Sequence, residues 1–262
     1  MAGLIIGPTM IEYSNFIYLD VYRTGSSHVL ALLEQIRRDE PVRSFRHSSL
    51  TKGRRWGLAG GKTVFTTVRN PWDWYVSLWA YGADGKSAIR RHLAPHFSAG
   101  ELAALYDRSD AVASFRRWLR LMHDADVLNQ VMKEHLPQSG LAPVIGLYTY
   151  RFLRVTTRFP RMLLRHPLIR SPHGAVTYHR LLKAYDTVLR NETLDDDLVA
   201  FVESHPEGFR DDAVATIRAE ASSRTNRSRR TLSSYRDYYG DSEAALVASR
   251  DRLFLDVFDY RF

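Results

Sequence analysis

Twice within its first 81 residues, this chain passes from an apolar, strand-like run through a short polar turn into an amphipathic, helix-like stretch. The first predicted strand covers residues 16–21 and its helix 29–38, whereas the second strand covers 62–68 and its helix 72–81. Strands that alternate with helices pair in parallel and are covered by helices on both faces. The pattern therefore predicts an α/β fold with three layers, α/β/α, around a central and mostly parallel sheet.

The rest of the chain extends this pattern without an internal repeat. Further strands are predicted at 42–46 and 185–189, and further helices within 82–135 and at 194–204, 211–221 and 242–255. The aromatic- and arginine-rich stretch 139–172 is expected to be irregular or lid-like, and the Ser- and Arg-rich stretch 222–239 to be a loop. We predict a single domain that covers residues 1–262.

Composition excludes several kinds of site and favours one kind of ligand. The chain has no cysteine, which excludes disulfides, thiolate metal sites and cysteine nucleophiles. Its 37 basic residues, 32 of them Arg, outnumber 29 acidic ones, and a net charge of +8 favours anionic ligands. The N-terminus lacks a basic leader region, and no apolar window approaches the ~18 residues that a membrane span needs. We expect a soluble, cytoplasmic protein with no membrane span.

The first polar turn, Arg23-Thr24-Gly25-Ser26-Ser27, has the composition of an anion-binding loop. The backbone N–H groups at a helix N-terminus, with hydroxyls and a cation beside them, can hold a phosphate or sulfate. Glycine would allow the backbone to approach that ligand closely. An ordinary turn in which Ser26 or Ser27 caps the helix would have the same residues. The loop alone leaves both interpretations open, and the adjacent His28 is expected to pack under the helix.

The second polar turn carries another possible anion contact. Arg69 stands where the strand ends, and Ser77 lies eight residues later on the predicted helix. Ligands of open α/β sheets bind at the carboxyl ends of the strands, where a guanidinium fork and a hydroxyl suit a phosphate. A surface arginine before a proline-started helix is the alternative interpretation.

Taken together, these features resemble the sulfotransferases that use 3′-phosphoadenosine 5′-phosphosulfate (PAPS). The resemblance spans nearly the whole chain and is weakest from about 85 to 180. It rests on Tyr22-Arg23-Thr24-Gly25-Ser26-Ser27, on Val68-Arg69-Asn70-Pro71-Trp72-Asp73 with Ser77, on Val188-Leu189-Arg190-Asn191-Glu192-Thr193-Leu194 with Asp197, on Asn226-Arg227-Ser228-Arg229-Arg230 with Tyr238-Tyr239, and on the ending Asp256-Val257-Phe258-Asp259-Tyr260-Arg261-Phe262.

The resemblance implies a P-loop-NTPase-like fold and an enzyme that transfers a sulfuryl group from PAPS. The acceptor would be a hydroxyl of a carbohydrate or of another small-molecule natural product, and neither a metal nor nucleic acid is expected as a partner. The residues implied to hold the 5′-phosphosulfate are Arg23, Thr24, Gly25, Ser26 and Ser27, and those implied to hold the 3′-phosphate are Arg69, Ser77 and Arg229.

Arg23 would also act in catalysis, because a cation there stabilises the charge that develops on the leaving phosphate. The family usually has Pro-Lys-Thr where this chain has Tyr22-Arg23-Thr24, and a planar guanidinium does not replace a compact ammonium automatically. A general base must also accept the proton of the acceptor. His47, 24 residues after Arg23, is the predicted base because an imidazole pKa of ~6.5 suits this task. A surface histidine in a basic loop is the alternative.

Two other functions remain open from the sequence. The first is a nucleotide-dependent kinase on a related fold, suggested by Gly60-Gly61-Lys62-Thr63. The Walker A motif, however, needs glycine where Trp56 stands, and it follows a strand, whereas this segment precedes one. The second is a non-catalytic protein that binds polyanions or nucleic acid through its positive charge, for which steep salt dependence is expected.

Overall fold

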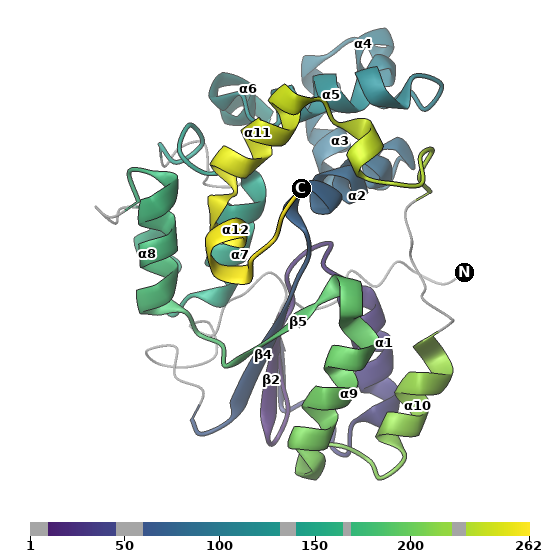
Figure 1. The fold of residues 1–262 in the computed structure, drawn as a ribbon, viewed down its shortest axis with the longest axis vertical. Helices are drawn as coiled ribbons and strands as arrows, with labels where there is room; N and C mark the ends of the chain where they lie inside the picture. Colours follow the sequence, from purple (N-terminus) through teal and green to yellow (C-terminus); the bar gives the residue numbers. More distant parts are fainter. Residues whose placement is uncertain (1–9, 46–59, 132–139, 165–168, 222–228) are drawn as a thin grey trace. The chain divides into compact units, whose positions relative to one another are not determined.

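The computed structural model of the chain describes residues 10–45, 60–131, 140–164, 169–221 and 229–262 (Figure 1). The chain divides into two compact units. Unit 1 comprises Met1–Arg69, Phe152–Pro160 and Leu182–Arg227, and unit 2 comprises Asn70–Arg151, Arg161–Leu181 and Ser228–Phe262. The chain therefore passes between the units five times, first between Arg69 and Asn70. The single sulfotransferase domain stays a prediction.

Unit 1 contains a five-stranded sheet with the strand order β3-β1-β2-β4-β5. The strands are β1 (Met10–Glu12), β2 (Phe16–Leu19), β3 (Arg43–Phe45), β4 (Thr63–Val68) and β5 (Thr187–Arg190). The neighbours β2, β4 and β5 are parallel, whereas β1 is antiparallel to both β2 and β3. The α/β class is thus confirmed.

The sheet is mixed, however, and not mostly parallel as the sequence predicted. The difference comes from β1, a strand of three residues that the sequence analysis missed. A tight turn joins β1 to β2, and the backbone N–H of Tyr13 donates to the carbonyl of Phe16 at 2.9 Å. A connection this short can only join antiparallel strands, because a parallel crossover needs a dozen or more residues.

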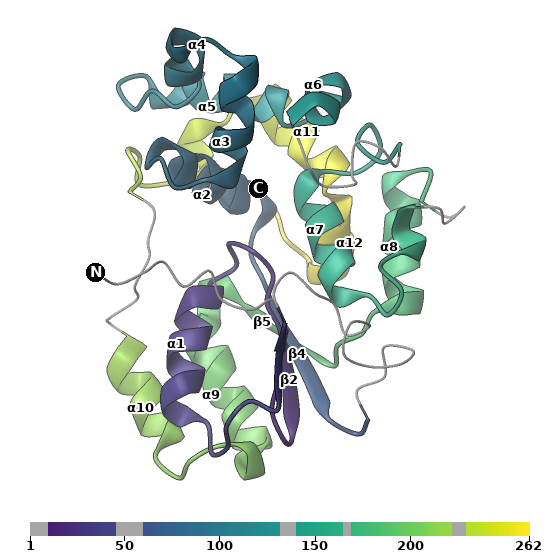
Figure 2. The ribbon, with the colours of Figure 1, turned by 180° about the vertical axis from the view of Figure 1, so that it is seen from behind.

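A helical layer covers one face of this sheet. Phe16, Tyr18 and Phe65 lie in one buried cluster with residues of α1 (Ser26–Ile36), α9 (Leu194–Ser204) and α10 (Ala213–Glu220). These three helices lie side by side in both views of the ribbon (Figures 1 and 2). Ile17 and Leu19 point to the opposite face and are also fully buried. The buried parallel strands hold the loops at their carboxyl ends on a rigid base.

Unit 2 is helical. Its helices are α2 (Pro71–Ala83), α3 (Ala88–Leu93), α4 (Ala99–Ala104), α5 (Ala111–Leu121), α6 (Ala125–Val131), α11 (Asp241–Arg250) and α12 (Arg252–Phe258), while α7 (Leu147–Thr156) and α8 (Pro172–Leu182) each pass from one unit to the other. The described residues also include the 3₁₀ turns Ala94–His96, Met162–Leu164, Asn191–Thr193, Pro206–Gly208 and Arg236–Tyr238. Stacked rings join three of the helices. The ring centroid of Tyr148 in α7 lies 4.4 Å from that of Trp74 in α2 and 3.9 Å from that of Phe254 in α12.

Two predictions about this region were wrong. The stretch 139–172 contains the helix α7, whose buried Tyr148 and Tyr150 form part of the unit 2 core and are not lid-like. The helix predicted over 242–255 is two helices that meet at Asp251. The fully buried carboxylate of Asp251 accepts hydrogen bonds from Tyr75 and Thr149, which fixes the break at that residue.

Candidate anion-binding site

The loop between β2 and α1 holds its backbone in an unusual conformation. Arg23 has φ 67° and Gly25 has φ 96°, both in the left-handed region. Such a conformation is costly for an arginine, so the surrounding structure must hold it there. Alternation of left- and right-handed residues can turn successive N–H groups toward one point and create a concave anion site. The strained residue is the one that sequence analysis predicted to act in catalysis.

Gly25 is required here for its lack of a side chain as well as for its φ. A Cβ at this position would lie 2.6 Å from Nδ2 of Asn191 and 2.7 Å from Cδ2 of Leu194. These two neighbours belong to the segment that follows β5, 166 residues further along the chain. The structure thus brings together two segments that the resemblance had selected separately. Asn191 was not predicted as a site residue, because nothing in the sequence shows that it lies against Gly25.

Thr24 anchors the loop to the sheet. Its fully buried hydroxyl donates to the carbonyl of Val21 at 2.6 Å and forms a hydrogen bond with Oγ1 of Thr67 in β4, also at 2.6 Å. Thr67 in turn forms a hydrogen bond with the hydroxyl of Tyr18. The backbone N–H of Thr24 also donates to the carbonyl of Val21, at 3.4 Å, so Thr24 fixes the position of the loop through both its side chain and its backbone.

The N-terminus of α1 is not capped by a side chain. Gly25 is the N-cap, and Ser26 and Ser27 are the first two helical residues, so neither serine is the cap that the sequence predicted. No acidic residue lies in the first turn. A helix start of this kind presents N–H groups and the positive end of the helix dipole to a ligand. His28 is buried and forms a hydrogen bond with Asp195 at 2.7 Å, as expected for a residue packed under the helix.

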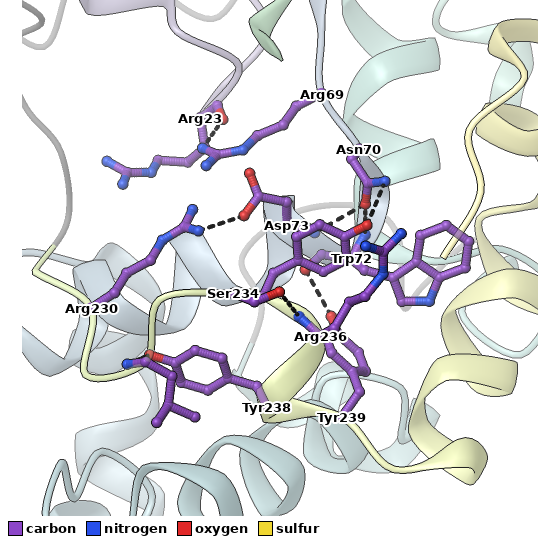
Figure 3. A network of polar contacts seen from close by, with 12 residues as sticks. Arg23, Arg69, Asn70, Trp72, Asp73, Arg230, Ser234, Arg236, Tyr238 and Tyr239 are labelled. Atoms are coloured by element: carbon purple, nitrogen blue, oxygen red, sulfur yellow. Dashed lines mark hydrogen bonds and ion pairs between the residues drawn. The ribbon is translucent and has the colours of Figure 1, made fainter.

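Arg69 lies beside this loop. Because β2 and β4 are parallel neighbours, their carboxyl ends meet at the same edge of the sheet, and Nη1 of Arg69 donates to the carbonyl of Arg23 at 3.3 Å (Figure 3). The next strand, β5, ends at Arg190, which pairs in register with Val68. Three neighbouring strands thus each end at or near an arginine. The edge is cationic, which suits a phosphate or sulfate.

The start of α2 in unit 2 is organised differently. The Asn70 side chain accepts hydrogen bonds from the backbone N–H groups of Trp72 at 3.0 Å and of Asp73 at 3.2 Å, which caps the helix. Asp73 also forms an ion pair with Arg230 at 2.7 Å (Figure 3). The protein's own acidic residue therefore occupies the positive end of this helix.

The same helix start anchors the C-terminal segments. Nδ2 of Asn70 donates to the hydroxyl of Tyr235 at 3.3 Å and to the carbonyl of Arg261 at 3.1 Å. The hydroxyl of Tyr239 donates to the carbonyl of Trp72 at 2.8 Å (Figure 3), and the Trp72 ring contacts that of Phe262. Within unit 2, Asn70 and Trp72 at the helix start, the Tyr-Tyr pair and the chain ending therefore lie together.

The other predicted site residues differ in their positions. Ser77 is in α2 and only 1% exposed, and Arg229 is exposed in unit 2. His47 lies outside the described residues, so its role as a base stays a prediction. Lys62, which belongs to the segment resembling a Walker motif, precedes β4 and donates to Oε1 of Glu12 and to the carbonyl of Tyr13. It therefore lies at the end of β4 opposite to Arg69.

Comparison with family models, curated proteins and solved structures finds no match to this chain. Within the described ranges, no group of three or more His, Asp or Glu side chains is placed to hold a metal ion. Of the helices described, none combines the length and the apolar character needed to cross a membrane.

Proposed function

We propose that this chain is a PAPS-dependent sulfotransferase with a P-loop-NTPase-like fold. The observation that carries the proposal is the loop at the carboxyl end of β2, where strained Arg23 and uncapped α1 form a set of hydrogen-bond donors beside Arg69. The guanidinium groups of Arg23 and Arg69 and the N–H groups at the start of α1 are donors. They fit the oxygens of a phosphosulfate and would repel a metal ion.

The pairs of segments that pack against each other support PAPS as the ligand over a generic phosphate. In unit 1 the loop packs against Asn191 and Leu194, and in unit 2 the start of α2 packs against the C-terminal segments. The resemblance had selected each of these segments from the sequence. A kinase is less well supported, because Lys62 is engaged by Glu12 at the other end of β4.

In this proposal PAPS supplies the sulfuryl group, and the chain's residues position it and stabilise charge. An acceptor oxygen forms a bond to sulfur while the bond from sulfur to the 5′-phosphate oxygen breaks, and the acceptor's proton passes to a base, proposed as His47. Arg23 and the N–H groups at the start of α1 stabilise the charge that develops on the departing phosphate. The acceptor is a hydroxyl of a carbohydrate or of another small molecule.

The 3′-phosphate is assigned first to Arg69. Its guanidinium lies at the cationic edge of the sheet and bridges to the loop. The start of α2 is a less suitable phosphate site, because Asp73 already fills it. Ser77 is buried, so its contact with the nucleotide stays a prediction.

The test is calorimetric binding of 3′-phosphoadenosine 5′-phosphate, with AMP and magnesium-ATP as comparison ligands, at two salt concentrations. We expect tight binding that depends on the 3′-phosphate. The variant Arg69→Ala should lose about 10- to 100-fold in affinity, since a charge-assisted hydrogen bond contributes roughly 1.5–3 kcal/mol. The control Arg38→Ala removes the same charge from a half-exposed arginine of unit 1 that pairs with Asp211, and it should bind normally.

Equal and weak binding of all three ligands, with steep loss at high salt, would instead indicate a polyanion binder. An unchanged affinity in Arg69→Ala would show that the 3′-phosphate lies elsewhere. Transfer of labelled sulfate from PAPS to a panel of sugar and phenolic acceptors would then identify the acceptor.

A further inference from the structure

Asp20 is a buried acidic residue that directly precedes the anion-binding loop. Its side chain follows the end of β2 and is only 9% exposed. Within the described part of the chain, its Oδ1 atom has no hydrogen-bond partner, while the carboxyl group accepts a bond from the hydroxyl of Ser26. A buried carboxylate with one unpaired oxygen is costly, and nothing in the proposed transfer reaction uses it.

The surroundings of Asp20 favour its neutral form. Burial raises the pKa of Asp20 to about 7, and the hydrogen bond from Ser26 opposes this only in part. The neighbouring elements carry these titratable or charged groups: Tyr18 on β2, Arg23 in the loop, Arg69 after β4, His28 on α1 and Asp195 on α9. Nε2 of His28 forms a hydrogen bond with Oδ1 of Asp195, and the hydroxyl of Tyr18 forms one with Thr67.

Ser26 connects this carboxyl group to the anion site. It is the first residue of α1, where its N–H and hydroxyl lie at the uncapped helix start. When Asp20 is ionised, the Ser26 hydroxyl donates to the carboxylate and is not available to a ligand. When Asp20 is protonated, its own O–H can donate to Oγ of Ser26, and the serine hydrogen becomes available to an anion. Protonation also removes a negative charge next to the site.

We propose that Asp20 is a positioning residue that takes up one proton when the loop of residues 22–27 binds a phosphate or sulfate group. The inference rests on the proposed function only in that this loop holds an oxyanion. Its consequence is a pH dependence of affinity. Above the pKa of Asp20 in the free protein, the binding constant should rise up to about tenfold for each unit by which the pH falls, and it should level off below that pKa.

The experiment is calorimetric titration of the full chain with sodium sulfate from roughly pH 5.5 to 8.5, at constant ionic strength. Sulfate remains a dianion throughout this range, so any change in affinity comes from the protein. At each pH the titration is repeated in two buffers with different ionisation enthalpies, which counts the protons taken up on binding. We expect nearly one proton per sulfate at the alkaline end and almost none at the acidic end.

The variant Asp20→Asn imitates the protonated residue. It should bind sulfate at all pH values as tightly as the wild type does at low pH, with no proton uptake linked to this site. Asp211→Asn is the matched control, because it removes the same charge in unit 1 from a side chain that is 99% exposed, and it should keep the wild-type pH dependence. Circular dichroism at each pH checks that the variants fold. If Asp20→Asn does not fold, the proton count on the wild type still tests the proposal.

Sulfate affinity that is independent of pH, or that keeps its pH dependence in Asp20→Asn, would overturn the proposal, as would the absence of any sulfate binding. These results are distinguishable from failure of the proposed function. Tight, 3′-phosphate-dependent nucleotide binding without proton uptake would leave the sulfotransferase proposal standing and reject the role of Asp20. Proton-linked sulfate binding without preference for the 3′-phosphate would support the role of Asp20 and reject the sulfotransferase proposal.

Discussion

The helices α1 and α2 both start directly after a strand of the sheet, yet their N-termini are completed in opposite ways. Gly25 begins α1 without a side-chain cap and without an acidic residue in the first turn. Asn70 begins α2 with its side chain bonded to two backbone N–H groups, and Asp73 in the first turn pairs with Arg230. One helix start remains available to an external anion, whereas the protein's own groups satisfy the other.

This difference shows that a strand-turn-helix pattern does not by itself make a ligand site. The α2 start has the more regular cap. It also binds the C-terminal segments of unit 2, through hydrogen bonds to Tyr235 and Arg261. The α1 start instead keeps Arg23 in a costly conformation, of the kind that clusters at ligand-binding sites. We therefore expect substitutions at the α2 start to act mainly on stability, and substitutions at the α1 start to act on anion binding as well.

The largest effect is expected for Gly25→Ala. The new Cβ would meet Asn191 and Leu194 at less than 3 Å, and alanine is unfavourable at φ 96°. Together these costs should lower the free energy of unfolding by about 2–4 kcal/mol, measured by urea denaturation, and should weaken sulfate binding. Gly100→Ala is the control, since a Cβ there meets nothing within 4 Å, and it should be neutral or slightly stabilising. Equal effects of the two substitutions would contradict the close packing of Gly25 against Asn191 and Leu194.

A second prediction concerns the interior behind α2. Burial raises the pKa of Asp251 to about 6 and lowers that of His123 to about 4, and both side chains contact Tyr75 of α2. The raised Asp251 pKa means that the folded state gains stability as the pH falls from about 6 to 4, while the lowered His123 pKa means that it loses stability between about 6.5 and 4. The two contributions oppose each other, at roughly 3 kcal/mol each.

The variant Asp251→Asn removes the gain and leaves the loss. Relative to the wild type, its free energy of unfolding should fall by up to about 3 kcal/mol as the pH decreases from 6 to 4. Urea denaturation at several pH values measures this difference directly. Parallel stability curves for the two proteins would show that the pKa of Asp251 is the same in the folded and unfolded states.

A smaller effect is expected for Asn70→Ala. Loss of the cap should lower the free energy of unfolding by about 1–2 kcal/mol. Asn70→Asp keeps the capping oxygen but cannot donate to Arg261, so it should recover most of the cap and leave the tail less firmly held. Hydrogen exchange at residues 259–262 separates the two contributions. If Asn70→Ala weakened nucleotide binding without a loss of stability, the α2 start would be a ligand site as well.

Much of the architecture was predictable because it depends on local pattern. The strands at 62–68 and near 187, and the helices that begin near Ser26, Pro71 and Leu194, follow from apolar periodicity and helix-start residues. The strand β1 was missed because three residues are too few to show a period, and its pairing depends on a neighbour. The stretch 139–172 was misinterpreted because its aromatic residues, such as Tyr148, pack against distant rings in α2 and α12.

The sequence by itself determined which chemical groups this protein has to offer. It has no thiol, it carries an excess of arginine, and it places small polar residues with Arg23 and Arg69 after two strands. Only the tertiary structure decided how these groups are arranged in space. It put Arg23 into a left-handed conformation, placed Asn191 against Gly25, and buried Asp20 without a full set of partners. Such outcomes depend on burial and on contacts between segments far apart in the chain, and these are properties that no local pattern contains.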